Sequence, residues 1–242
     1  WNKPHVLYYK CRSEKLRKIG GNILEHDYQL GMRVQQILKE QNLENPVNFE
    51  QIAQWDNLEN MAIIKQKYTE LLMLIGVSSN LQDGSKTAQR IIEMLIQENF
   101  SGLDYGNFPS VNTLENTFNY QEPLVAGNII FQSTCEHHLV AIKGTALIAY
   151  QPQEQIIGLK KLNQVLHFFA ARPQLQERLT RQVFVTLQYL LKTQNIAIII
   201  KAQHDCMGNQ NLRNDNTWHQ TSQFGGIFCE NKELKRSILN QV

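Results

Sequence analysis

Apolar residues recur at helical spacing through the first third of the chain. Over residues 28–43 and 57–76 they return every three or four positions, which predicts two amphipathic helices. The glycine that closes the second segment is placed to end its helix. A third helix is predicted over residues 85–100, beginning near Ser85 or Thr87.

The hydrophobic pattern changes period in the middle of the chain. Residues 128–134 and 144–152 are short, rich in β-branched side chains and bounded by Gly, Pro or Asn, which is typical of strands. Helical spacing returns over residues 159–193 and is interrupted at Arg172-Pro173, because proline disfavours a helical residue before it. Two further strands and a closing helix are predicted at 196–206, 220–228 and 231–241. This order of elements favours an α+β fold with an antiparallel sheet.

Three regions follow from this pattern. Residues 1–27 mix aromatic and basic side chains with little sign of a core, so we expect a peripheral arm there. Residues 28–84 form an N-terminal helical region, and residues 85–242 form the main domain. The formal charge of the 242-residue chain is only +2, so we expect no sequence-independent binding to nucleic acid, which needs a clustered basic face.

Cysteine usage and hydropathy indicate the compartment. The four cysteines, at positions 11, 135, 206 and 229, are widely spaced, and no secretory signal is apparent, so a disulfide framework is not expected. A reducing cytoplasm fits this usage better. The longest apolar run lies near Asn195–Ala202 and is far shorter than the ~20 residues that cross a bilayer, so no membrane span is predicted.

Three candidate metal ligands, Cys135, His138 and Cys206, fall in two short motifs. Cys135 and His138 have C-x-x-H spacing, and His204 and Cys206 lie two residues apart at the predicted end of a strand. Thiolate and neutral imidazole are the ligands that zinc prefers, and three protein ligands leave one tetrahedral position for water. A hydrolytic site is therefore one interpretation. Structural zinc with Cys229 as fourth ligand, or buried thiols without metal, are the alternatives that the residues alone leave open.

Longer motifs carry a family resemblance. The segments "FSGLDYGNFP", "STCEHHLV", "IIGLKKLNQVLHFFAARPQLQERLT", "AQHDCM" and "FGGIF" occur in the order and spacing typical of the GTP cyclohydrolase I family, which this chain resembles over roughly residues 28–242. The resemblance implies the tunnelling fold, an antiparallel sheet backed by helices, here with an N-terminal helical extension. It also implies a homo-oligomer, in the family a decamer of two pentameric rings, with active sites shared between subunits.

The resemblance also implies roles for the clustered residues. In the family the zinc ligands fall on Cys135, His138 and Cys206, and the proton-handling residues fall on His137 and His204. The reaction implied is zinc-dependent hydrolysis of the imidazole ring of GTP at C8, which releases formate and forms 7,8-dihydroneopterin triphosphate. An imidazole that titrates near neutral pH serves as acid and then as base in such a reaction.

Substrate contacts are implied in two places. The motif "PQLQERL" places Gln176 and Glu177 where the family binds the guanine ring, with the carboxylate receiving its N–H donors. Lys161 in "GLKKLNQ" and Arg90 in "TAQR" fall on positions that the family uses toward the phosphates.

The chain departs from the family pattern in the phosphate pocket. Lys160 stands where serine is usual, and Gln164 and Gln210 stand where arginine is expected. Neutral glutamine cannot replace the planar arginine fork that binds phosphate, unless Lys160 or Arg213 compensates. Three hypotheses follow: an enzyme acting on GTP, a paralogue acting on a less phosphorylated or different purine, and a non-catalytic purine-binding protein. Retention of the five Cys and His residues argues against the third.

Overall fold

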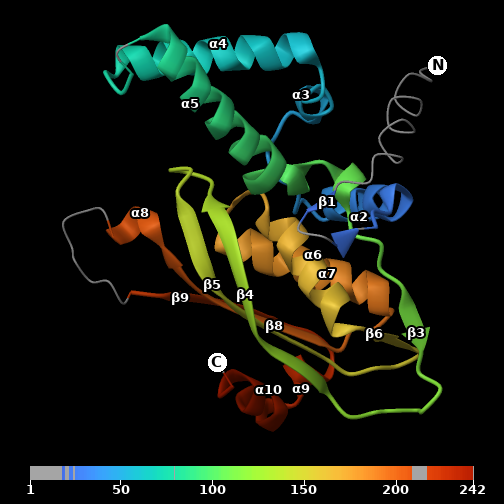
Figure 1. Ribbon diagram of the computed structural model, residues 1–242. Coiled ribbons are helices and arrows are strands. Elements are labelled where there is room, and N and C mark those ends of the chain that lie inside the picture. The colour runs from blue at the N-terminus through green and yellow to red at the C-terminus, as the bar shows by residue number, and fades with distance from the viewer. Residues whose placement is uncertain (1–17, 20–21, 24, 79, 209–216, 242) are drawn as a thin grey trace.

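A computed structural model describes residues 18–19, 22–23, 25–78, 80–208 and 217–241 (Figure 1). Within it β1 (Lys18–Ile19) and β2 (Asn22–Ile23) form a short antiparallel pair. Most of the predicted arm, together with Cys11, Gln210 and Arg213, lies outside the described residues.

The centre of the fold is a five-stranded sheet in the order β7-β4-β5-β8-β9. Its strands are β4 (Leu124–Cys135), β5 (Ala141–Tyr150), β7 (Pro173–Gln174), β8 (Ile196–His204) and β9 (His219–Phe224). The long strands pair antiparallel, as predicted, and the α+β class is confirmed. The expectation of a purely antiparallel sheet is wrong at one edge, where β7 pairs parallel with the end of β4. Proline lacks an N–H donor and suits such an edge position.

Helices cover both faces of this sheet (Figure 1). The interruption predicted at Arg172-Pro173 separates α6 (Leu159–Ala170) from α7 (Gln176–Leu191), which pack on one face. The other face is covered by α9 (Ile227–Glu230) and α10 (Lys232–Leu239). Side chains alternate between the faces along each strand. The second face buries a smaller cluster, made by Leu147, Ala149, Ala197, Ile199, Phe228 and Ile238.

The N-terminal helices form a separate layer. These are α2 (Tyr28–Glu40), α3 (Phe49–Ile52), α4 (Leu58–Leu74) and α5 (Leu81–Met94). Figure 1 shows α4 and α5 as a hairpin of helices that extends beyond the sheet. None of the described helices is both long and apolar enough to span a membrane. The shorter elements are η1 (Leu95–Asn99), η2 (Ser101–Leu103), η3 (Tyr105–Asn107), β3 (Thr113–Glu115), β6 (Gln155–Ile157) and α8 (Asp205–Gly208).

The start predicted for the third helix is wrong. The helix α5 begins at Leu81, because the side chain of Asn80 caps it by accepting a hydrogen bond from the backbone N–H of Asp83. Ser85 and Thr87 therefore lie inside the helix. The boundary expected between residues 84 and 85 also falls within α5, so a continuous helix joins the two regions.

The helix pair α4–α5 exposes much apolar surface in the single chain. Few side chains of α4 are buried, although its end at Gly76 matches the prediction, with a left-handed φ of +76°. The exposed apolar residues around this hairpin are Leu58, Ile63, Leu71, Leu74, Ile75, Val77 and Leu81. Exposed apolar side chains that gather on one helix pair are typical of an interaction site.

A buried guanidinium joins the N-terminal layer to the sheet. Arg172 is fully buried, and its Nη1 donates to Oε1 of Glu44 at 3.2 Å, to Oδ1 of Asn45 at 3.3 Å and to the hydroxyl of Tyr105 at 3.2 Å. Burial raises the pKa of Tyr105, so the neutral phenol donates to Glu44 at 2.7 Å. The Arg172 Cζ atom lies 4.6 to 4.8 Å from three ring centroids, those of Tyr105, Phe168 and Phe169.

We expect Glu44→Gln to lower the free energy of unfolding by about 3–5 kcal/mol, because it leaves the Arg172 charge buried without its carboxylate. Equilibrium urea denaturation measures this change. Glu70→Gln serves as control, since Glu70 pairs with Lys67 on the exposed surface of α4 and its loss should change stability little. Equal small effects of both substitutions would show that the Arg172 contact does not stabilise the fold.

Candidate metal centre and substrate cavity

The candidate metal ligands converge at one end of the sheet. Cys135 is the last residue of β4 and His204 the last of β8. The strand β5 lies between them and brings their ends level, because its residue Ile142 pairs with His204 just after β5 has turned back from β4. Cys206 follows within α8, beside the same end of the sheet (Figure 1).

The distances in this group fit tetrahedral zinc. The Sγ atoms of Cys135 and Cys206 are 3.9 Å apart. Two thiolates at the usual Zn–S length of about 2.3 Å and a tetrahedral angle stand about 3.8 Å apart. The Nδ1 atom of His138 lies 3.8 Å from the Cys135 Sγ, also close to the separation of two such ligands. The donor set and its spacing therefore suit a zinc ion.

Two histidines compete for the third ligand position. The described residues whose ligand atoms all lie within 4.8 Å of one another are Cys135, His204 and Cys206. His138, predicted as the ligand, contacts Cys135, whereas His204, predicted to handle protons, has a ring nitrogen within 4.8 Å of both thiols. The assignment of His138 as ligand and His204 as catalytic residue stays a prediction.

The turn after β4 holds the first half of the site. Leu139 adopts a left-handed φ of +54°, and its N–H donates to the Cys135 carbonyl at 2.9 Å. In this turn the Nδ1 of His138 lies 3.8 Å from the Cys135 thiol. The side chain of Glu136 forms an ion pair through both oxygens with Arg178 on α7. Arg178 was not predicted as a site residue, and its only signal in the sequence is its place beside Glu177. The side chains of His137 and His138 remain exposed.

His204 sits in a more enclosed environment. Its Nε2 lies 2.9 Å from Oε1 of Gln176, and its ring centroid lies 5.6 Å from that of His219. Burial and the nearby His219 lower the pKa of His204, an effect that the Glu177 carboxylate opposes. The ring is therefore neutral near pH 7 and is able to accept a proton. Burial and the neighbouring Cys135 thiol raise the pKa of Cys206 when no metal is bound.

The two residues predicted to bind guanine differ in exposure. Gln176 and Glu177 begin α7, and the Glu177 side chain is exposed at that end of the helix. Gln176 is only 3% exposed, and both atoms of its amide are hydrogen-bonded within the protein. A contact between Gln176 and substrate stays a prediction, and the partners that the structure gives it are protein groups.

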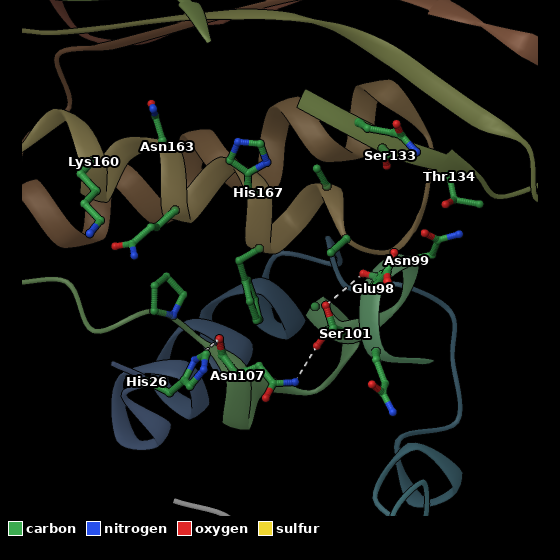
Figure 2. A pocket seen from close by; sticks show the side chains of 18 of the residues that line it. His26, Glu98, Asn99, Ser101, Asn107, Ser133, Thr134, Lys160, Asn163 and His167 are labelled. Atoms are coloured by element: carbon green, nitrogen blue, oxygen red, sulfur yellow. Dashed lines mark hydrogen bonds between the residues drawn. The ribbon is translucent and has the colours of Figure 1, made fainter. Parts of the chain in front are cut away.

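A cavity of about 590 Å³ lies between α6 and residues of the segments 25–26 and 97–109. Figure 2 shows Lys160 and His167 on α6 facing His26 and Asn107 on the opposite wall. Ser133, at the end of β4, also lines it. Among the described residues, neither the two thiols nor His204 belongs to this lining, so one chain presents its metal group and this cavity separately.

Only some of the residues from the predicted phosphate pocket line this cavity. Lys160 and Gln164 line the cavity, and the Oε1 atom of Gln164 is buried without a hydrogen-bond partner among the described residues. The Lys161 Nζ donates instead to the Ser110 carbonyl at 2.5 Å. Arg90 is exposed on α5 and belongs neither to the described lining nor to the metal group.

Comparison with known proteins identifies relatives over most of the chain. The family model described as GTP cyclohydrolase I matches residues 64–242. A "GTP cyclohydrolase 1" of Histophilus somni is 40% identical over 176 residues, which cover 73% of this chain and 81% of that protein. Proteins of the same name from Haemophilus ducreyi and Erwinia tasmaniensis are each 37% identical, and the alignments cover 87% and 86% of this chain and 95% and 94% of theirs.

We expect Cys135→Ser and Cys206→Ser to lose most bound zinc, because each removes one of the two thiolates that stand at zinc-ligand separation. Elemental analysis of the purified full-length protein measures the metal content per chain. Cys229→Ser is the matched control and should retain zinc, since Cys229 lies exposed on α9.

The same measurement assigns the third ligand. Zinc should be lost in His138→Ala and retained in His204→Ala. The opposite result would make His204 the ligand, and loss of zinc in Cys229→Ser would favour a structural four-ligand site.

Proposed function

Since this chain belongs to the GTP cyclohydrolase I family and is an enzyme of that family, we propose that it hydrolyses the imidazole ring of GTP at C8, releasing formate and forming 7,8-dihydroneopterin triphosphate. The observation that carries the proposal is the pair of thiols 3.9 Å apart with imidazole nitrogens beside them. We propose zinc as the metal, held by Cys135, Cys206 and His138. When bound there, zinc activates water as a nucleophile near neutral pH.

The chain's own residues would move the protons. The lowered pKa of His204 keeps its ring neutral at pH 7, so it accepts a proton and later returns it as the purine ring opens. His137, exposed in the turn beside the metal group, is the second proposed proton carrier. Because neutral imidazoles titrate within a few units of pH 7, one residue serves as base and then as acid.

The guanine ring is proposed to bind at the start of α7. The Glu177 carboxylate is exposed there and is close enough to His204 to act on its pKa. A carboxylate accepts hydrogen bonds from the ring N–H and amino groups of guanine. We therefore assign base recognition to Glu177 and do not extend it to Gln176, whose amide is already bonded to protein groups.

The cavity that we propose for the substrate phosphates carries little positive charge in one chain. Lys160 is the only Lys or Arg among the described residues that line the cavity, which also includes Glu25 and Glu98. Gln164 adds no charge. These observations favour, as a second candidate, a guanine compound with fewer phosphates than GTP, and we place GTP first because the metal group and Glu177 are retained.

We propose that copies of this chain complete the site, in a ring assembly such as the family's decamer. Two observations support the proposal: the metal group does not line the cavity, and Arg90 lies apart from both. The exposed apolar hairpin α4–α5 offers surface for such contacts. Because Cys135 and Cys206 bind metal only as reduced thiolates, we also propose a reducing compartment, the cytoplasm.

The zinc-loaded protein should release formate from GTP, and a formate assay across GTP, GDP, GMP and guanosine tests this. The Cys206→Ser variant is the control and should release none. Formate from a less phosphorylated compound but not from GTP would establish the second candidate. No formate from any of the four would refute the proposed reaction.

Phosphate recognition is tested with the same assay. Lys160→Ala should raise KM and Gln164→Arg should lower it, each with little change in kcat, because contacts remote from C8 bind ground and transition states alike. Lys232→Ala, on exposed α10, is the matched control and should change neither. Unchanged KM in Lys160→Ala would remove this cavity from the substrate site.

The assembly is expected to be a large homo-oligomer at micromolar concentration. Light scattering coupled to size-exclusion chromatography measures its mass, to be compared with the 28.1 kDa of one chain. A monomeric protein that releases formate from GTP would contradict the shared-site proposal.

A further inference from the structure

The buried amide of Gln176 has a determined orientation. Its Nε2 lies 3.1 Å from the carbonyl oxygen of Ile200, 3.1 Å from that of His219 and 3.2 Å from Oγ1 of Thr221. Carbonyl oxygens only accept hydrogen bonds, so the amide NH₂ must face them. The reversed amide would place its own oxygen against two carbonyl oxygens in a site that is 3% exposed.

Neighbouring hydroxyls agree with this orientation. Thr180 Oγ1 donates its single hydrogen to the Gln176 backbone carbonyl at 2.8 Å, so the 2.7 Å contact between Thr180 and Thr221 is donated by Thr221. The oxygen of Thr221 is then free to accept from the Gln176 amide. The two N–H groups of the Gln176 amide thus face three acceptors, the carbonyls of Ile200 and His219 and the Thr221 hydroxyl oxygen.

The orientation of Gln176 determines the tautomer of His204. The amide oxygen of Gln176 lies 2.9 Å from the His204 Nε2 and only accepts, so Nε2 must carry the hydrogen. In the neutral ring the lone pair is then on Nδ1. Which nitrogen is basic in an active-site histidine is set by the hydrogen bond that the other makes.

From these contacts we infer that Gln176 is a positioning residue for the reaction: it anchors His204 to the backbone of β8 and β9 and holds the ring as the Nε2–H tautomer, so that the lone pair of the neutral ring is on Nδ1. The role in turnover rests on the proposed function. The tautomer itself does not, because it follows from the hydrogen bonds alone.

The first experiment measures the tautomer in the full-length, zinc-loaded wild-type protein labelled with ¹⁵N-histidine. NMR correlations between ring nitrogens and ring protons distinguish the two nitrogens, and comparison with His204→Ala assigns the signal. A protonated Nε2 on His204 supports the inference, and a protonated Nδ1 overturns it. No substrate is needed, so failure of the proposed reaction would leave this result intact.

The second experiment compares two methionine substitutions on α7. Gln176→Met removes the acceptor of His204 while nearly keeping side-chain volume, and should lower kcat about 10- to 100-fold, with KM and zinc content little changed. Gln182→Met is the matched control, because Gln182 is also buried on α7 but bonds to the Leu43 carbonyl, to Asn45 and to the Gln174 amide rather than to His204.

Both variants are expected to lose stability in urea, and only Gln176→Met should lose kcat. Equal kcat in the two variants would show that Gln176 is merely structural and would overturn the inference about turnover. If Gln176→Met does not fold, the wild-type tautomer measurement decides.

Discussion

The buried guanidinium of Arg172 connects the core to the metal group. It binds Glu44 and Tyr105 from the N-terminal layer, and the chain continues from it directly into β7. The two residues of β7 pair with Thr134 and Cys135, and the Gln174 carbonyl accepts from the N–H of Glu136 at 3.0 Å. Displacement of Arg172 would therefore shift the strand end that carries the first thiol. A charge buried at this depth is tolerated only because its partners are present.

The first turn of α7 supports both segments that carry candidate metal ligands. Arg178 holds the turn after β4 through Glu136, and Gln176 holds the end of β8 through His204. Residues two apart in this turn thus hold both halves of the site, while Glu177 between them stays exposed. Rigid support of this kind is what lets thiols and imidazoles meet at metal-ligand separation without rearrangement.

In a single copy of the chain, the metal group and the cavity are separate. The thiols lie at the end of the sheet, and the cavity with Lys160 lies between α6 and residues of the segments 25–26 and 97–109. Exposed apolar residues on α4 and α5 would be costly in an isolated chain. Both features agree with the assembly proposed above, in which surfaces of one copy become the walls of another copy's site.

The sequence by itself determined most helices and strands, the break at Arg172-Pro173 and the choice of Cys135 and Cys206 as candidate ligands, because periodicity, proline geometry and side-chain chemistry are local properties. It did not determine that Lys160 rather than Lys161 faces the cavity, or that the amide of Gln176 is occupied by His204. Only the tertiary structure decided which lysine faces the cavity and which group the Gln176 amide binds. Both outcomes depend on sheet register and on helix rotation against the core, which bring together groups such as Gln176 and His204 that lie 28 residues apart.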